Sequence, residues 1–259
     1  MTDGFKYIFD EAIQNYNKYG SRLESFRNTL NNPMLYNFMI NGGEIDNYSL
    51  NIAKDINYEL YSKFLNQKQK GYTGYLGCEE KYREIDDNDS KHILILTFLF
   101  NNRNFKNIVE IGGGYGNCVR LINNIISYDS WKIIDLPHIN EVQKFFLEKE
   151  INDISKIDFI DGTNNQNLYF SNKCIDLVIG THSISELSWD NFINYMKNVV
   201  IYSNYLYLGY NKNCPSPLLI NNKLRYILSC GFVKIDNIDY KESFGADVSY
   251  TLFLNTNYK

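Results

Sequence analysis

From about residue 107 onward, short runs of apolar residues alternate with segments in which apolar residues recur every three to four positions. This alternation is typical of a parallel sheet whose strands are joined by crossover helices. Residues 232–238 and 248–254 also have the pattern of strands, but the connection between them is too short for a helix, so we expect them to pair antiparallel. The pattern predicts strands over 108–111, 131–134, 157–160, 175–179 and 205–208, and helices over 117–126, 139–146, 192–200 and 218–228.

The fold class follows from the number and order of these elements. Five strand and helix units closed by an antiparallel hairpin predict an α/β, Rossmann-like sheet of seven strands that is mostly parallel, with the last strand antiparallel and helices on its flanks. The six-stranded sheet of NAD dehydrogenases fits this pattern less well.

The first hundred residues have a helical pattern instead. Apolar residues follow the helical period over 5–16 and, less cleanly, over 52–64, and Ser90 is placed to cap a helix over 93–100. Between the second and third of these segments, residues 71–77 are too rich in glycine for a helix or a strand, so we expect a loop that could cover a site. We therefore predict an N-terminal helical region over 1–104, where a homodimer could form, and a ligand-binding domain over 105–259.

Composition narrows the class of protein. The 259 residues are 44% hydrophobic and 22% charged, with a net charge of -4, as in ordinary globular proteins. The chain has no stripe of basic residues of the kind that binds nucleic acid, so we expect no nucleic-acid partner. No apolar run approaches the ~20 residues of a membrane span, and the N-terminus does not resemble a leader, so we expect no membrane partner and a cytoplasmic location. The five cysteines are scattered, which predicts neither disulfides nor a metal site.

The most informative motif is the run from Val109 to Asn117, Val-Glu-Ile-Gly-Gly-Gly-Tyr-Gly-Asn, between the first predicted strand of the sheet and the next helix. Glycine suits a tight turn that a ligand approaches closely, and the exposed N–H groups at a helix start favour an anionic group. A dinucleotide fingerprint beginning at Gly112 would require glycine at position 117, where this chain has Asn. The motif therefore disfavours a dinucleotide.

Acidic side chains end the next two predicted strands. Asp135 ends the second strand, where a carboxylate accepts hydrogen bonds from ribose hydroxyls, and Asp161 with Gly162 ends the third. A carboxylate at position 161 could accept from an adenine amino group, although an aspartate at a strand end often bonds to nearby backbone N–H groups instead. Open α/β sheets bind ligands at this edge, so we expect a nucleoside site there.

The fourth strand ends in Thr181-His182-Ser183-Ile184-Ser185-Glu186. The first and fourth strands are neighbours in a doubly wound sheet, and a crevice forms where the winding reverses, so we expect His182 to face Gly112. His182 is the first candidate for a general base, with Glu186 as a second base or as the group that orients the imidazole.

Together these residues resemble the class I S-adenosylmethionine-dependent methyltransferases, and more narrowly the sugar O-methyltransferases of polysaccharide biosynthesis. The resemblance lies in Glu110 to Gly116, Ile134-Asp135-Leu136-Pro137 and His182 to Leu187, and it extends over roughly residues 60–210. It implies methyl transfer from S-adenosylmethionine to a sugar hydroxyl, with Glu110 at the amino end of the cofactor. The predicted cofactor-binding residues are Glu110, Gly112, Gly113, Gly114, Gly116, Asp135, Leu136, Asp161, Gly162 and Thr181.

The acceptor would be a small molecule or glycan. Tyr72, Tyr75 and Arg83 could form a lid over it, and Ser183 is a further candidate for contact with it. Three alternatives remain open at this point: a methyltransferase acting on RNA, protein or another small molecule, an NAD(P)-dependent oxidoreductase, and a non-catalytic subunit that keeps the nucleoside pocket.

Overall fold

The computed structural model describes residues 45–67, 69–71, 81–83, 87–164, 168, 170, 175–212, 217–241 and 247–257. They form two compact units that interleave along the sequence. The first contains the helices that come before the sheet, together with residues 113–127 and 136–156, and the second contains the sheet and the later helices. The predicted helix over 5–16 lies outside the described residues, and the predicted domain boundary at residue 104 stays a prediction.

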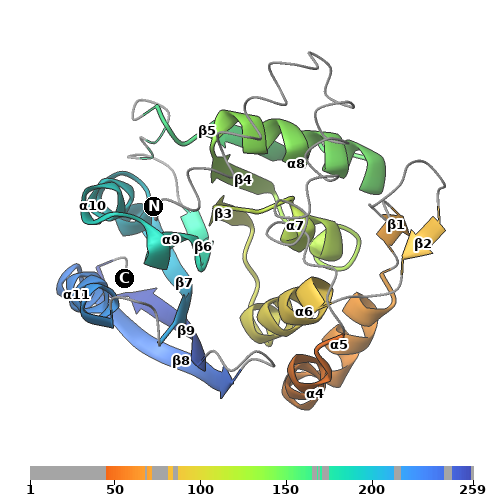
Figure 1. Cartoon of the computed structure of the whole chain (residues 1–259), viewed down its shortest axis with the longest axis horizontal. Helices are drawn as coiled ribbons and strands as arrows, with labels where there is room; N and C mark the ends of the chain where they lie inside the picture. Colours follow the sequence, from red (N-terminus) through yellow and green to blue (C-terminus); the bar gives the residue numbers. More distant parts are fainter. Residues whose placement is uncertain are drawn as a thin grey trace. The chain divides into compact units, whose positions relative to one another are not determined.

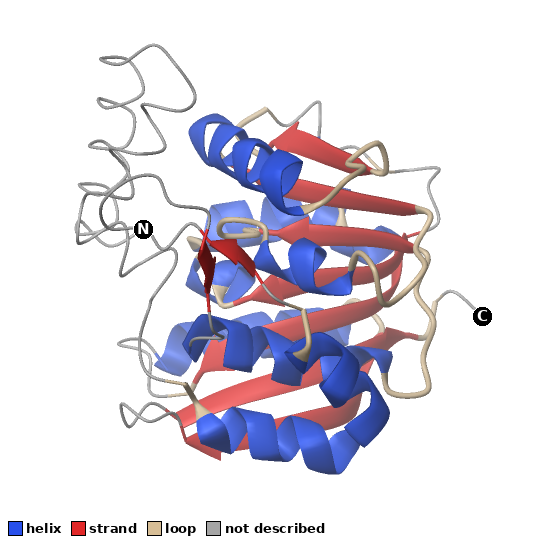
Figure 2. Cartoon of the chain, turned by 90° about the vertical axis from the view of Figure 1, so that its right-hand side faces the viewer, coloured by secondary structure: helices blue, strands red, loops and turns tan. Residues whose placement is uncertain are grey.

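The second unit is built on a sheet of seven strands in the order β5-β4-β3-β6-β7-β9-β8, drawn as red arrows in Figure 2. Neighbouring strands from β5 to β7 are parallel, and β9 runs antiparallel to both β7 and β8. This arrangement confirms the predicted fold class, a Rossmann-like, mostly parallel sheet. The strands are β3 (Asn107–Ile111), β4 (Ser130–Asp135), β5 (Ile157–Asp161), β6 (Ile175–Thr181), β7 (Ser203–Asn211), β8 (Phe232–Lys241) and β9 (Asp247–Asn255).

The central strands are buried along almost their whole length. Four of the five residues of β3 are buried, and so are five of the seven residues of β6. Continuous burial is typical of parallel strands in the middle of a sheet, and it explains why their sequences are apolar runs rather than alternating ones. Ile111, Val178 and Leu206 belong to one apolar core with Phe192 and Met196.

The helices of this unit are α9 (Ser183–Glu186), α10 (Trp189–Asn198) and α11 (Pro217–Ser229), with a short 3-10 turn, η3 (Val200–Tyr202). Figure 1 shows α10 and α11 side by side, and the two helices are in contact. Ser188 caps α10 by accepting from the N–H of Asn191 at 3.4 Å. Gly231 follows α11 with a φ of +90°, the left-handed conformation in which glycine commonly ends a helix.

The first unit is mainly helical, with one short antiparallel hairpin. The helix pattern over 52–64 is divided in two because Asn57 is extended and its side chain accepts from the N–H of Leu60, starting a new helix. The prediction that Ser90 is a cap was wrong, because the helix begins earlier and Ser90 is fully buried inside it. Its elements are α4 (Asn47–Ile56), α5 (Tyr58–Leu65), β1 (Gln69–Gly71), β2 (Lys81–Arg83), α6 (Asp87–Phe100), α7 (Asn117–Ile122) and α8 (Pro137–Glu150).

Two further expectations for this unit need correction. Gly71 ends β1 rather than opening a loop, and α7 ends at Ile122, one turn before the predicted end at Ile126.

None of the helices that the structure describes combines the length and hydropathy that a membrane span requires.

Candidate functional site

At the bend after β3, the backbone of Gly112 is in close contact with the side chain of Ser183. Gly112 has a φ of +73°, and its N–H donates to the carbonyl of Ile134 at 2.9 Å. A β-carbon at this position would lie 2.5 Å from Cβ of Ser183, and the Ser183 hydroxyl donates to the carbonyl of Ile111. The chain after β6 therefore packs directly against the bend after β3, and no side chain larger than glycine fits between them.

The remainder of the glycine loop belongs to the first unit. Gly114 and Gly116 have φ values of +57° and +94°, and the Gly116 N–H donates to the carbonyl of Gly113 at 2.9 Å. A β-carbon on Gly116 would lie 3.0 Å from Leu147, whereas one on Gly114 would have no neighbour within 4 Å among the described residues. Gln143 donates from Nε2 to the carbonyl of Gly114 at 2.9 Å. The loop is thus anchored to α8.

Asn117, at the first position of α7, explains why the dinucleotide fingerprint fails. Its side chain is fully buried, and its Nδ2 lies 2.9 Å from Oδ1 of Asp89 and 2.9 Å from Nδ1 of His92. Its Oδ1 accepts from Nε of Arg120 at 2.7 Å, while Arg120 also forms an ion pair with Asp89 at 2.6 Å. Asn117 therefore connects α7 to α6, a role that glycine could not fill.

Asp135 and Asp161 lie next to each other, because they are register partners at the ends of β4 and β5. Both are half-buried. Oδ1 of Asp161 accepts from the N–H of Thr163 at 2.8 Å and from its hydroxyl at 2.6 Å. This is the local arrangement that competes with adenine binding in the sequence interpretation, so Asp135 is the stronger candidate for contact with a ligand.

Tyr195 on α10 joins these aspartates and was missed by the sequence interpretation. Its hydroxyl donates to the carbonyl of Gly162 at 3.4 Å, and a β-carbon on Gly162 would lie 2.5 Å from this hydroxyl. Burial raises the pKa of Tyr195 to about 12, and the charges of Asp135 and Asp161 act in the same direction. The phenol therefore stays protonated as a hydrogen-bond donor beside two carboxylates.

Two further predicted residues, Glu110 and Leu136, have defined hydrogen-bond partners. Glu110 is only 3% exposed, and its Oε2 accepts from the indole Nε1 of Trp131 at 3.0 Å. The indole thus fixes the carboxylate, and the assignment of Glu110 to the amino end of a cofactor stays a prediction. Leu136 caps α8 through its carbonyl, which accepts from the N–H groups of Ile139 and Asn140 at 2.9 Å.

His182 has an unusual backbone. It combines a φ of +62° with a ψ of -32°, a conformation that costs a residue with a side chain about 1–3 kcal/mol. Its N–H donates to the carbonyl of Gly209 at 2.9 Å, and its carbonyl accepts from the hydroxyl of Ser185 at 2.6 Å. The half-buried imidazole meets the ring of Tyr250 edge to face, with 6.3 Å between ring centroids. Strain at such a position is a reason to suspect function.

In the sequence, Thr181 comes directly before His182, and Glu186 comes shortly after it. Glu186 ends α9, and its N–H donates to the carbonyl of His182 at 3.1 Å. Burial raises the pKa of the Glu186 carboxyl, and the charge of Lys223 partly offsets this rise. The hydroxyl of Thr181 is buried, and among the described residues it has no hydrogen-bond partner. The two candidate bases, His182 and Glu186, therefore lie on one short segment at the end of β6.

The predicted lid cannot be placed in the same way. Tyr72 and Tyr75 lie outside the described residues, and Arg83 ends β2 in a segment of which only the backbone is described. Their roles stay predictions.

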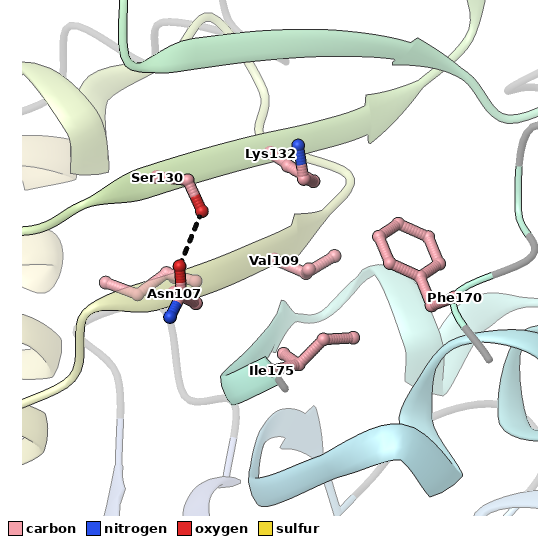
Figure 3. Close-up of a pocket in the computed structure, with 7 residues that line it drawn as sticks. Asn107, Val109, Ser130, Lys132, Phe170 and Ile175 are labelled. Atoms are coloured by element: carbon pink, nitrogen blue, oxygen red, sulfur yellow. Dashed lines mark hydrogen bonds between the residues drawn. The ribbon is translucent and has the colours of Figure 1, made fainter. Parts of the chain in front are cut away.

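A cavity of about 260 Å³ lies at the opposite edge of the sheet, where the strands begin (Figure 3). The hydroxyl of Ser130 donates across it to Oδ1 of Asn107 at 3.0 Å, and the ammonium of Lys132 is paired with Asp158. None of the predicted site residues lines this cavity. It is therefore separate from the carboxyl ends of the strands, where the aspartates and His182 lie.

Comparisons with known proteins bear on the fold. No family model and no curated protein matches the chain. The N-methyltransferase NodS from Bradyrhizobium japonicum WM9, solved in complex with S-adenosyl-L-homocysteine, matches with a TM-score of 0.51 and 16% identity over 66% of this chain and 87% of that chain. PH1948 from Pyrococcus horikoshii, a proposed RNA methyltransferase, matches with a TM-score of 0.50 and 15% identity over 80% of this chain and 98% of that chain. At these identities the likeness shows a shared Rossmann-like methyltransferase fold.

Proposed function

We propose that this chain is an S-adenosylmethionine-dependent methyltransferase that acts on a sugar hydroxyl, in a small molecule, a nucleotide sugar or a glycan. The observation that carries the proposal is the set of groups at the carboxyl ends of adjacent strands: a bend at Gly112, the paired carboxylates Asp135 and Asp161, and the strained His182. The methyltransferase fold of the chain and the S-adenosyl-L-homocysteine bound by NodS support this cofactor.

The residues at this edge fit a nucleoside cofactor. Asp135 is a half-buried carboxylate that can accept from ribose hydroxyls, and Tyr195 is a donor beside it. The buried hydroxyl of Thr181, at the end of β6, has no hydrogen-bond partner among the described residues, so it can bond to a ligand. S-adenosylmethionine supplies a methyl carbon made electrophilic by the neighbouring sulfonium.

The residues of this chain would act on the acceptor. A sugar hydroxyl is a weak nucleophile at neutral pH, so a base that removes its proton contributes about 10²–10⁴-fold. His182 is suited to this task because imidazole is the side chain that most often acts as a general base near neutral pH. Glu186 follows one helical turn later and either takes the proton or orients the imidazole.

The sugar acceptor rests on the resemblance of Ile134-Asp135-Leu136-Pro137 and His182 to Leu187 to the sugar O-methyltransferases. The buried Asn117 argues against the oxidoreductase alternative, because its side chain occupies the position where the dinucleotide fingerprint has glycine. A methyltransferase for RNA, protein or another small molecule and a non-catalytic subunit remain as outcomes of the test.

The test is incubation of the protein with methyl-labelled S-adenosylmethionine and separate pools of nucleotide sugars, glycans, other small metabolites, RNA and protein, with mass spectrometry of each pool. We expect the label on an oxygen of a sugar. Label in another pool instead would replace the acceptor, and binding of the cofactor without transfer to any pool would favour the non-catalytic subunit. A His182→Gln variant, assayed in parallel, identifies background transfer.

A further inference from the structure

Lys223, on α11, is a fully buried lysine with no counterpart in the sequence interpretation. Its side chain is 0% exposed, and Nζ donates to the carbonyls of Ile184 at 3.2 Å, Ser185 at 2.7 Å and Leu187 at 2.5 Å. Lysine is almost never fully buried unless its charge is compensated. An ammonium has three N–H donors, enough for one bond to each of these carbonyls.

The three carbonyls belong to one short stretch, α9 and the residue that follows it. The last carbonyls of a helix have no partner within the helix, and a lysine from another element can satisfy them. The ammonium also lies 5.4 Å from the ring centroid of Phe192, which adds a cation-π attraction. Lys223 therefore fastens α9 to α11 through charge-assisted bonds, which are about twice as strong as neutral ones.

The stretch that Lys223 fastens begins directly after the strained residue. A backbone such as that of His182 persists only when its surroundings hold it in place. Its N–H is held by Gly209, its carbonyl by Ser185, and the next residue by the bond of the Ser183 hydroxyl to Ile111. The bonds from Lys223 fix the carbonyls of Ile184, Ser185 and Leu187 in the stretch that follows, and they add a charged anchor to these neutral bonds.

We propose that Lys223 is a positioning residue, whose buried ammonium fixes α9 and thereby the orientation of the His182 imidazole and the Glu186 carboxyl at the end of β6. The kinetic part of this inference rests on the proposed function. Without the ammonium, three carbonyls lose their donors and α9 is free to shift. A shift of about 1 Å in a catalytic group can cost about 10²-fold in rate.

The experiment compares Lys223→Met, which keeps the length of the side chain, with Lys223→Arg, which keeps the charge and the donors. In Lys223→Met we expect kcat for methyl transfer to fall by about 10²-fold, with KM for S-adenosylmethionine within about threefold, since most of the candidate cofactor residues lie at the ends of β3, β4 and β5. We expect Lys223→Arg to recover part of the loss. The exposed Lys234→Met on β8 is the matched control and should keep its kcat.

A second readout does not depend on turnover. The chain has three histidines, so the ring signals of His182 in an NMR spectrum can be assigned with His182→Gln and followed separately. We expect Lys223→Met to move the signals of His182 and to leave those of the other two histidines in place. Unmoved His182 signals in a folded variant would overturn the proposal, as would an unchanged kcat.

If Lys223→Met does not fold, Lys223→Gln provides the same comparison, because the amide keeps two N–H donors without the charge. Failure of the wild-type chain to methylate any acceptor would contradict the proposed function, while the NMR comparison would still decide whether Lys223 positions His182.

Discussion

Replacing His182 by Gln is expected to lower kcat for methyl transfer by about 10²–10⁴-fold, the usual contribution of a general base. Glutamine approximates the size of the imidazole and keeps hydrogen-bonding groups, but it cannot take up a proton at neutral pH. The Kd for S-adenosyl-L-homocysteine should stay within about threefold, because Asp135 and the glycine loop are unchanged. Lys234→Gln, at an exposed residue of β8, is the control and should keep wild-type kcat.

A His182→Gly variant separates chemistry from backbone strain. Glycine adopts a positive φ without cost, so relief of about 1–3 kcal/mol of strain offsets the entropic cost of glycine, about 0.5–1 kcal/mol. We therefore expect the free energy of unfolding of His182→Gly to equal or exceed that of the wild type, while its kcat is as low as that of His182→Gln. Wild-type kcat in either variant would remove His182 from the mechanism, and clear destabilisation by glycine would contradict the account of strain.

Replacing Asp89 by Ala is expected to lower the free energy of unfolding by about 3–5 kcal/mol, as observed when one partner of a buried ion pair is removed. Asp89 is 1% exposed and Arg120 is 4% exposed, so the variant leaves a guanidinium buried without its carboxylate. It also removes one of the two partners of the Asn117 amide nitrogen at the start of α7. The measurement is unfolding by urea, with the signal followed by circular dichroism.

Glu59→Ala is the matched control for Asp89→Ala. Glu59 and Lys63 form an ion pair in the same unit, but their side chains are 79% and 51% exposed, so we expect no measurable loss of stability. A loss below 1 kcal/mol for Asp89→Ala would mean that solvent reaches the Arg120 guanidinium, and that the network around Asn117 does not hold α7 in place.

The sheet could be predicted from the sequence because its signals are local. Every strand predicted from residue 108 onward is present, with ends shifted by a few residues. The apolar runs of the central strands β3 and β6 are buried along most of their length. The antiparallel hairpin followed from a connection too short for a helix. The position of β9 between β7 and β8 has no such local signal, because it depends on which of the last two strands pairs better with the edge of the sheet at β7.

The candidate site could be predicted only in part. Residues at strand ends were found because their position in a parallel sheet follows from the order of the elements, as for Asp135, Asp161 and His182. Tyr195 and Lys223 were missed because both occur in amphipathic helices, where a tyrosine or a lysine usually lies at the surface or in the core without a special role. Their polar ends reach partners far away in the sequence, and no spacing rule indicates such contacts.

The misplaced helix start at Ser90 has a similar cause. Serine is a common cap, but α6 begins before it and Ser90 is fully buried, so the burial of the first turn outweighed the local preference. In the sequence, the break at Asn57 showed only as a less regular helical period over 52–64. Asparagine caps a helix only where the chain before it leaves the helical conformation, and the sequence does not show where that happens.

The central claim is that the carboxyl ends of β3, β4 and β5 bind the nucleoside of a sulfonium cofactor, and isothermal titration with S-adenosyl-L-homocysteine tests it most directly. We predict saturable binding by the wild-type chain, binding at least about tenfold weaker in Asp135→Ala through loss of hydrogen bonds to a charged group, and no binding of NADH. Asp158→Ala, which removes a largely exposed carboxylate on β5, should bind as the wild type does. Binding of NADH without binding of S-adenosyl-L-homocysteine, or equal affinity in Asp135→Ala and the wild type, would contradict the account.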